Sequence, residues 1–481
     1  MVPEDYNNLG GAQIPIAVNR LPAAMPSQRI GSLIINPGGP GGSGVEAAFG
    51  FANVLPQALR DDFDLVGFDP RGVGSSMPVR CDGDLFGDAN VLSTCVKQSG
   101  PYLAFLGTTS VVRDLDRLRA AVGDQKLTYL GFSYGTAIGG VYADMFPQNV
   151  RALVLDGDVD PAAGAKNTTK NFDATTYGSQ DFNGTINTFL HLCDLSKECT
   201  LGPDSTSKLD KLNADVSTLP VSNFKGGQPV TTAALDKLIV GSMYSIEEWA
   251  SLGIALGDAA NGDASTLAAL INYEEHGFPA SMNARPDTTY AQVSVSCADF
   301  IDRRNDYECA GFPAPADPIP AITTAQGAPP MVVIGTKGDP ATPYQFSAKM
   351  ATALGNTTEL TWEGAGHTAF TESSCISDAA TRYLVSLTVP AAIDCPFLPG
   401  STTDSDRADR IFGHRAMMNE AARIESILEK EGDTPDVAKC ISTQLASTND
   451  HRFVVQELLG VDAPDLVRLR TSIEQRCTTG G

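Results

Sequence analysis

The sequence contains few of the residue types on which metal, redox and nucleic-acid sites depend. Its 481 residues include only five histidines, and none of the ten cysteines forms a Cys-x-x-Cys pair. Zinc and dithiol sites need such ligands at short spacing, so we expect no metal and no cofactor. Acidic residues number 57 against 34 basic ones, a formal net charge of −23. Because such a surface repels phosphate backbones, we expect no nucleic-acid partner, and the charge favours solubility in a salty or extracellular medium.

The chain also lacks a long apolar run. No stretch of about 18 apolar residues is present, so we expect no membrane span. The first residues, Met1–Tyr6, have neither the basic nor the apolar region of a signal peptide. We expect a secreted, extracellular protein in which an initiator Met replaces the leader. No feature of the sequence indicates an oligomeric state.

Cysteines, in contrast, are numerous and fall in neighbouring couples. The couples are Cys81 and Cys95, Cys193 and Cys199, Cys297 and Cys309, Cys375 and Cys395, and Cys440 and Cys477. An even count in local couples is typical of disulfides formed in an oxidising compartment, which would also place the protein outside the cell. Spacing does not fix the connectivity, and buried free thiols are the alternative.

Short apolar runs separated by helical patterns dominate the first 161 residues. Residues 14–18 alternate as an exposed strand does. Continuous apolar runs, typical of buried parallel strands, lie at 32–35, 64–68, 127–130 and 152–155. Between the runs at 64–68 and 127–130, residues 111–122 place Val112, Leu115 and Leu118 on one helical face. This alternation predicts an α/β fold with a mostly parallel sheet.

The alternation stops near residue 162 and returns near residue 321, with strand patterns at 331–334 and 358–362. An insertion between strands of one sheet is most simply a cap over the carboxyl edge, where ligand sites of α/β folds lie. After a polar linker, residues 407–477 read as helices, with one apolar face formed by Met417, Ala421, Ile424 and Leu428. We predict four segments: a core in two parts (1–161 and 321–400), a mainly helical cap (162–320) and a small C-terminal helical module (401–481).

One five-residue turn is the most informative chemical signal. Gly131-Phe132-Ser133-Tyr134-Gly135 follows a predicted strand and opens a helix rich in small residues. This context is typical of the nucleophile elbow of α/β-hydrolases, in which flanking glycines let a strained turn pack against its neighbours. We therefore predict Ser133 as a nucleophile. A turn that only packs a small-residue helix is the alternative.

A serine hydroxyl needs a neighbouring base, and histidine is the usual one. His367 lies in a glycine-rich loop directly after the strand predicted at 358–362, and it follows the nucleophile in the order that α/β-hydrolases use. The other four histidines fall in the predicted cap or in the C-terminal helices: His191, His276, His414 and His451. We predict His367 as the base, with a plain turn residue as the alternative.

The acid is expected after the strand that precedes the histidine loop. Asp339 follows the strand at 331–334, where it would accept the Nδ1 proton of His367. Asp156, after an earlier core strand, is the rival, because some hydrolases keep their acid there. Asp69 is interpreted as a structural residue of its own turn.

A glycine-rich loop follows the buried run at 32–35, with the sequence Asn36-Pro37-Gly38-Gly39-Pro40-Gly41-Gly42-Ser43-Gly44. Glycines there let backbone N–H groups point at a tetrahedral oxyanion. One donor would come from this loop and the other from the N–H of Tyr134. A phosphate-binding loop is the alternative, but no Gly-Lys-Ser/Thr ending follows, and Pro37 and Pro40 remove donors.

As a set, these segments resemble the secreted tripeptidyl aminopeptidases and their prolyl aminopeptidase relatives, a family of α/β-hydrolases. The matching segments are the glycine loop, 68–74, 131–135, 155–157 with 160–161, 338–343 and 366–367, with weaker support at 244–249 and 296–299. The resemblance covers about residues 2–400, and the 401–481 module departs from it. It implies a triad of Ser133, Asp339 and His367, with Gly39 and Tyr134 as the oxyanion hole.

The family consists of exopeptidases that release short peptides or single residues from a free N-terminus, so the resemblance implies a peptide substrate. An acidic cap residue must then hold the substrate ammonium group, and Glu247 and Glu248 are the candidates. A solvated helix face is the other interpretation of these two residues. A carboxylesterase acting on small acyl esters is the alternative enzyme. A non-catalytic binding protein on a hydrolase fold is the alternative of another class.

Overall fold

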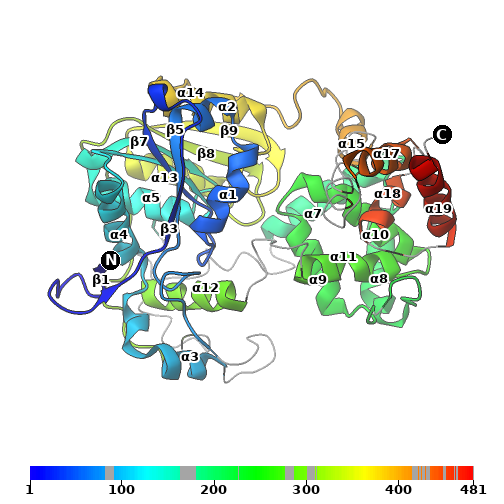
Figure 1. Cartoon of the computed structure of the whole chain (residues 1–481), viewed down its shortest axis with the longest axis horizontal. Coiled ribbons are helices and arrows are strands. Elements are labelled where there is room, and N and C mark those ends of the chain that lie inside the picture. The colour runs from blue at the N-terminus through cyan, green and yellow to red at the C-terminus, as the bar shows by residue number, and fades with distance from the viewer. Residues whose placement is uncertain are drawn as a thin grey trace. The chain divides into compact units, whose positions relative to one another are not determined.

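The chain is divided into two compact units, each made of two stretches of sequence. The structure, a computed structural model, describes residues 1–81, 91–162, 180–225, 227–276, 286–300, 309, 311–413, 421, 424, 428, 434–447, 451–459, 461 and 464–479. Unit 1 comprises Met1–Thr175 and Met282–Phe397, and unit 2 comprises Thr176–Ser281 and Leu398–Gly481. Figure 1 labels the helices of unit 2 and part of the helices and strands of unit 1.

Unit 1 is built on an eight-stranded sheet with the order β10-β9-β8-β7-β6-β4-β5-β3 (Figure 1). Its strands are β3 (Val18–Leu21), β4 (Gly31–Asn36), β5 (Phe63–Phe68), β6 (Leu127–Phe132), β7 (Val150–Asp156), β8 (Met331–Gly338), β9 (Thr357–Ala365) and β10 (Ile393–Cys395). The neighbouring pairs of this sheet are parallel, except that β3 runs antiparallel to β5. The predicted α/β fold with a mostly parallel sheet is confirmed.

The edges of the sheet differ from the prediction. The single strand expected at 14–18 is interrupted: β2 (Gln13–Ile14) pairs with β1 (Val2–Pro3), and β3 begins only at Val18. Pro15 lies in the break, and its ring removes the N–H group that a continuous ladder would use. At the opposite edge, the short strand β10 pairs with β9 and was not predicted, because three residues carry no readable period.

Helices cover the sheet on both faces. Alternate strand residues such as Tyr129, Leu153 and Val333 share one hydrophobic core with α4 (Thr108–Ala121), α5 (Tyr134–Met145) and α13 (Gln345–Leu354). Helices α1 (Gly44–Val54), α2 (Gln57–Asp62) and α14 (Ser374–Ser386) contact the strands outside that core. Successive side chains of a strand point to opposite faces of the sheet. The continuous apolar runs of the sequence therefore reflect strands that are buried on both faces.

Two further helices of unit 1 lie in its connecting segments, α3 (Val91–Ser99) and α12 (Pro286–Asp299).

The ten cysteines form five disulfides, and each joins one of the neighbouring couples: Cys81–Cys95, Cys193–Cys199, Cys297–Cys309, Cys375–Cys395 and Cys440–Cys477. The expectation of disulfides is therefore confirmed, and the connectivity that spacing left open follows the neighbouring couples. The disulfide Cys297–Cys309 ties the end of α12 to the segment that leads back to the sheet.

Unit 2 is helical. Its helices are α7 (Gln180–Leu195), α8 (Ser205–Asp215), α9 (Thr232–Ser242), α10 (Trp249–Ala260), α11 (Ser265–His276), α15 (Asp404–Phe412), α17 (Pro435–Ala446), α18 (His451–Leu458) and α19 (Pro464–Thr479). The buried carboxylate of Asp258 on α10 accepts hydrogen bonds from Arg452 Nε (2.6 Å) and Gln456 Nε2 (3.0 Å) on α18. Within the described ranges, no helix has both the length and the apolar composition of a membrane span.

The bounds of the two units differ from the predicted segment boundaries. Residues 401–481 were expected to form a separate module, but they share unit 2 with the inserted helices, and Ile424 and Leu428 are buried in one core with Ala269. Met417, from the same predicted face, lies outside the described residues. Conversely, α12 falls within the predicted cap (162–320) but belongs to unit 1. Packing between segments so far apart in sequence leaves no local pattern that could reveal it.

Candidate active site

Ser133 occupies a strained turn between β6 and α5. Its backbone has φ 54° and ψ −123°, a conformation that is rare for a residue with a side chain and typical of a nucleophile elbow. The N–H of Ser133 donates to the carbonyl of Asp156 (2.9 Å), which fixes the turn against β7. A Cβ on Gly131 would lie 2.7 Å from the carbonyl oxygen of Gly135, and a Cβ on Gly135 would lie 2.9 Å from the carbonyl oxygen of Asn36, so both flanking positions require glycine.

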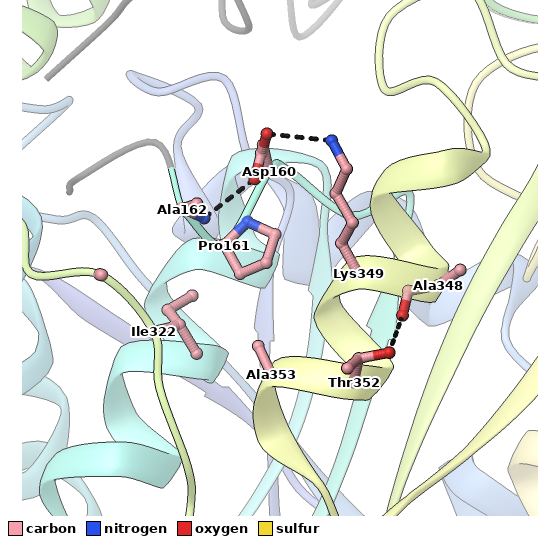
Figure 2. Close-up of a pocket in the computed structure, with 9 residues that line it drawn as sticks. Asp160, Pro161, Ala162, Ile322, Ala348, Lys349, Thr352 and Ala353 are labelled. Carbon is pink, nitrogen blue, oxygen red and sulfur yellow. Dashed lines mark hydrogen bonds and ion pairs between the residues drawn. The ribbon is translucent and has the colours of Figure 1, made fainter. Parts of the chain in front are cut away.

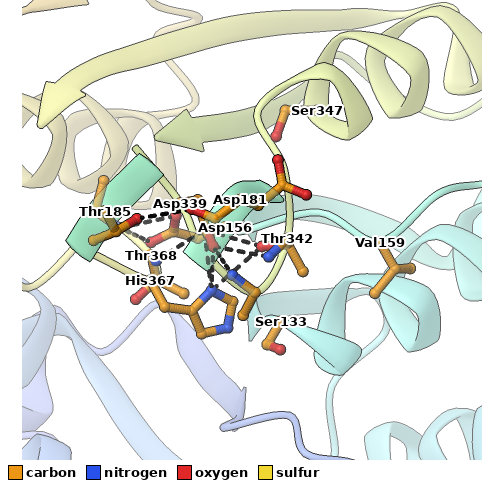
Figure 3. Close-up of polar contacts among 12 residues, drawn as sticks. Ser133, Asp156, Val159, Asp181, Thr185, Asp339, Thr342, Ser347, His367 and Thr368 are labelled. Carbon is orange, nitrogen blue, oxygen red and sulfur yellow. Dashed lines mark hydrogen bonds and ion pairs between the residues drawn. The ribbon is translucent and has the colours of Figure 1, made fainter. Parts of the chain in front are cut away.

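His367 and Asp339 lie in the loops that follow β9 and β8. Nδ1 of His367 is 3.0 Å from each of the two carboxylate oxygens of Asp339. Figure 3 shows one ring nitrogen of His367 directed at Asp339, with Ser133 near the opposite side of the ring. The His367 side chain is 10% exposed and that of Asp339 is fully buried, so this contact is shielded from water. The residues predicted as base and acid are thus brought into direct contact.

The carboxylate of Asp339 is held by its own loop. Its Oδ1 accepts the backbone N–H groups of Ala341 (2.9 Å) and Thr342 (2.8 Å), and its Oδ2 accepts the Thr342 hydroxyl (3.0 Å). Thr342 Oγ1 also lies 3.3 Å from Nδ1 of His367. Thr342 was not predicted as a site residue, although an Asp followed by Pro and, three positions on, by Thr is typical of a side-chain-stabilised turn. This loop orients the carboxylate toward the imidazole.

The surroundings of His367 shift its titration. Burial acts to lower the pKa of the imidazole, but the charge and hydrogen bond of Asp339, together with the charge of Asp156, outweigh it and raise this pKa above its ordinary value. A histidine with a raised pKa in contact with a carboxylate is a stronger proton acceptor than a free imidazole. The site can therefore stabilise an imidazolium.

Asp156, the rival acid, makes different contacts. Its carboxylate accepts the backbone N–H groups of Ala369 (3.0 and 3.1 Å) and Phe370 (2.8 Å), just beyond His367. Burial raises the pKa of Asp156 to about 7, against the opposing effect of these two N–H groups. Because its carbonyl accepts the N–H of Ser133, Asp156 joins the serine turn to the histidine loop. The contact with imidazole Nδ1 is made by Asp339.

The glycine-rich loop after β4 lies against the serine turn. Gly38 has φ 91°, and a Cβ at this position would lie 3.1 Å from the backbone nitrogen of Tyr134 and 2.9 Å from Cβ of Ser133. Gly39, the next residue, has φ 113°. Only a chain without side chains can approach the serine turn so closely. The predicted oxyanion donors, Gly39 and Tyr134, therefore lie on adjoining backbone segments.

Asp69 ties the far end of this loop to the core. Its carboxylate accepts the hydroxyl of Ser43 (2.6 Å) and the backbone N–H groups of Val45 (3.2 Å) and Ser75 (2.9 Å). The expected structural role in its own turn is present in the contact with Ser75. The contacts with Ser43 and Val45 extend that role to the glycine-rich loop.

The two glutamates predicted to bind a substrate ammonium group lie in unit 2. Glu247 and Glu248 end the short 3-10 helix Ile246–Glu248, and Glu247 is exposed. Ser133, Asp339 and His367 all belong to unit 1, so the role of the glutamates at the substrate N-terminus stays a prediction. Among the other histidines, His191 Nε2 lies 3.1 Å from Asp404 at the surface of unit 2. His414 and the side chains of His276 and His451 lie outside the described residues.

A separate hollow of about 470 Å³ opens beside α13 in unit 1 (Figure 2). At its edge, the buried carboxylate of Asp160 accepts Lys349 Nζ at 3.2 Å, while Ile322 and Ala353 contribute apolar surface. None of the predicted site residues lines it. Within the described ranges, no three His, Cys, Asp or Glu side chains are placed to hold a metal ion.

The fold and these contacts agree with the comparison to known families. Residues 31–374 match the model of the alpha/beta hydrolase fold family. This chain belongs to the α/β-hydrolase fold family. The prediction of a serine hydrolase with this fold is confirmed at that level.

Three curated relatives cover most of the chain. Serine protease Hip1 of Mycobacterium tuberculosis is 34% identical over 452 residues, which cover 81% of this chain and 85% of the relative. Carboxylesterase B of the same species is 33% identical over 445 residues, covering 81% and 84%. Tripeptidyl aminopeptidase of Streptomyces lividans is 28% identical over 430 residues, covering 80% of each chain. The chain is thus similar to proteins named as peptidases and to one named as an esterase.

Proposed function

We propose that this protein is a secreted serine exopeptidase, of the tripeptidyl or prolyl aminopeptidase type, that forms an acyl-enzyme on Ser133. The observation that carries the proposal is the contact between His367 Nδ1 and both carboxylate oxygens of Asp339, in loops beside the strained turn of Ser133. The names of two relatives, a serine protease and a tripeptidyl aminopeptidase, support a peptide substrate.

In the proposed mechanism, Ser133 Oγ attacks the scissile carbonyl while His367 Nε2 accepts the serine proton. Asp339 holds the imidazole by Nδ1 and stabilises its charged form. The negative oxygen of the tetrahedral intermediate accepts the N–H groups of Gly39 and Tyr134. The imidazolium then donates its proton to the leaving amine. Water, deprotonated by His367, attacks the acyl-enzyme and releases the carboxylic acid and free Ser133.

Secretion is supported by the disulfides. Five of them join all ten cysteines, and such a density is typical of proteins made in an oxidising compartment. An immunoblot of the native host's culture medium and cytosol tests the location. Recovery from the cytosol alone, with reduced cysteines, would reject it.

The exopeptidase step needs a group that recognises a free ammonium, and Glu247 and Glu248 are proposed for it. The variants Glu247→Gln and Glu248→Gln remove one negative charge each and keep the side-chain shape. We expect KM to rise for peptide substrates with a free N-terminus and to stay unchanged for simple acyl esters. Equal KM values for variant and wild type on free-amine substrates would remove both residues from the site.

A comparison of three substrates tests the proposal as a whole. Matched peptide anilides with free and acetylated N-termini are assayed beside an acyl ester, with Ser133→Ala as the blank. The proposal predicts cleavage of the free peptide at a much higher kcat/KM than the acetylated one. Equal rates on both peptides would contradict an exopeptidase. Turnover of the ester alone would favour the carboxylesterase alternative, which the relative of that name supports.

A further inference from the structure

A buried chain of hydrogen bonds joins three helices of unit 1 at the serine turn. Asp299, the last residue of α12, accepts both the backbone N–H (2.6 Å) and the hydroxyl (2.7 Å) of Thr108, the first residue of α4. Thr108 Oγ1 lies 2.6 Å from the hydroxyl of Tyr134, the first residue of α5. All three side chains are buried, with at most 3% of each residue exposed.

The direction of these bonds follows from the number of protons. Thr108 has one hydroxyl proton, which it donates to the Asp299 carboxylate, so the Tyr134 hydroxyl donates to Thr108 when Asp299 is ionised. The chain then runs from Tyr134 through Thr108 to the Asp299 carboxylate. Burial raises the pKa of Asp299 to about 7, and the two bonds from Thr108 act against that rise. Such a buried chain of hydrogen bonds is rigid because breaking any link leaves an unpaired polar group.

Helix α12 also touches the glycine-rich loop. A Cβ on Gly41 would lie 2.5 Å from the carbonyl oxygen of Thr288 and 3.1 Å from the backbone nitrogen of Gln292, both on α12. One helix is therefore linked to both segments that carry the proposed oxyanion donors, directly to the glycine-rich loop and through Thr108 to the side chain of Tyr134. Its end reaches Tyr134 through Thr108, and its first turns pack against the loop that contains Gly39. The disulfide Cys297–Cys309 fixes the same end of α12.

We propose that α12 braces the oxyanion hole, and that Asp299 and Thr108 are positioning residues for the backbone N–H of Tyr134. This inference rests on the proposed function, because it assumes an oxyanion at Tyr134. Oxyanion donors act because they are fixed in place before charge develops. A small displacement of one donor therefore raises the free energy of the transition state more than that of the bound substrate. The brace would therefore affect kcat and leave KM nearly unchanged.

The test compares variants that each remove one link of this hydrogen-bond chain without removing a catalytic group. Tyr134→Phe and Thr108→Val each remove one hydroxyl, Asp299→Asn removes the charge, and Thr108→Ser keeps the hydroxyl. End-point labelling with a fluorophosphonate counts competent sites, and the labelling rate and kcat are then expressed per site. We expect both per-site rates to fall about tenfold or more in Tyr134→Phe and Thr108→Val, with KM within about twofold, and Thr108→Ser to restore most of the rate.

Tyr142→Phe is the matched control. Tyr142 lies on the same helix α5, and its hydroxyl also contacts a carboxylate, Asp116 (2.8 Å), at the other end of the helix. The proposal predicts an unchanged per-site rate for this variant.

If the variants of the hydrogen-bond chain lose competent sites but keep the wild-type rate at each remaining site, the role of these residues is only structural and the brace is refuted. If Asp299→Asn does not fold, the two hydroxyl variants still decide. If the wild type itself is not labelled at Ser133, the proposed function fails, a result that no brace variant can produce.

Discussion

Asp339 contacts His367 with both of its carboxylate oxygens, each 3.0 Å from Nδ1. The same carboxylate is anchored at Oδ1 by the N–H groups of Ala341 and Thr342. This anchoring would place the oxygen of an amide at the Oδ1 position and its NH₂ group at the Oδ2 position if Asp339 were replaced by Asn. In the proposed triad, Asp339 would therefore control the tautomer of His367 as well as its charge.

Asp339→Asn should disable the enzyme at neutral pH. The two backbone N–H groups would hold the amide oxygen at the Oδ1 position, so an NH₂ group would replace Oδ2, which lies 3.0 Å from Nδ1, and would favour the tautomer with the proton on Nε2. That tautomer cannot accept the serine proton, and we expect kcat to fall by about 10⁴-fold. Steady-state kinetics at pH 7 to 8 measure the loss. A fall of less than tenfold would show that another group orients His367.

Asp156→Asn should be much milder. Oδ2 of Asp156 accepts the backbone N–H groups of both Ala369 (3.0 Å) and Phe370 (2.8 Å), while Oδ1 shares only the N–H of Ala369 (3.1 Å), so an amide oxygen at the Oδ2 position can keep one bond to each. We expect kcat to stay within about tenfold of the wild type, since the neutral amide retains the hydrogen bonds and loses only the charge. The same assay compares the two variants. If Asp156→Asn were the more damaging of the two, Asp156 would be the catalytic acid.

The pH dependence should report the raised pKa of His367. The base must be neutral to accept a proton, so activity is present above this pKa and lost as the pH falls through it. Asp339 raises the pKa above the ordinary value of 6.5, so the acid limb of kcat/KM should lie above pH 6.5. In Asp339→Asn, the residual activity should show an acid limb at lower pH. An acid limb that does not move between the two proteins would contradict the assignment.

The buried ion pair of Arg71 and Asp114 should support stability. Both side chains are almost fully buried, with Nε of Arg71 2.7 Å from Asp114 Oδ2, and Arg71 also donates to the carbonyls of Pro3 and Glu4. Arg71→Met would leave a buried carboxylate without its partner, and we expect a loss of about 3–5 kcal/mol in the free energy of unfolding.

Urea unfolding of Arg71→Met, Asp114→Asn and the double variant measures this coupling. The double variant should be less destabilised than the sum of the single ones, because it leaves no buried charge unpaired. Additive losses would show that the two side chains stabilise the protein independently.

The sheet and the residues of its loops were predictable because each has a local signal. Ser133, Asp339 and His367 all follow buried apolar strands, and the carboxyl ends of parallel strands meet at one edge of a sheet. The glycine-rich loop is recognisable because its backbone must pass within contact distance of Ser133 and Tyr134. In these places, sequence order and strand polarity suffice to bring the residues together.

The contacts between distant segments were not predictable. Asp299 and Thr108 are 191 positions apart, and nothing in either local sequence points to the other. The joining of 401–481 to the inserted helices depends likewise on side chains such as Asp258 and Arg452, which are 194 positions apart. A hydrophobic face on a helix indicates that it packs, but not which partner it packs against.

The most direct test of the central claim is the site of covalent modification by a fluorophosphonate. The protein is labelled at pH 8, digested, and the adduct located by mass spectrometry, with Ser133→Ala and His367→Ala treated in parallel. The account predicts one adduct on Ser133 in the wild type, none in Ser133→Ala, and labelling slowed by orders of magnitude in His367→Ala. An adduct on another residue, or an unreactive wild-type protein that is folded, would contradict it.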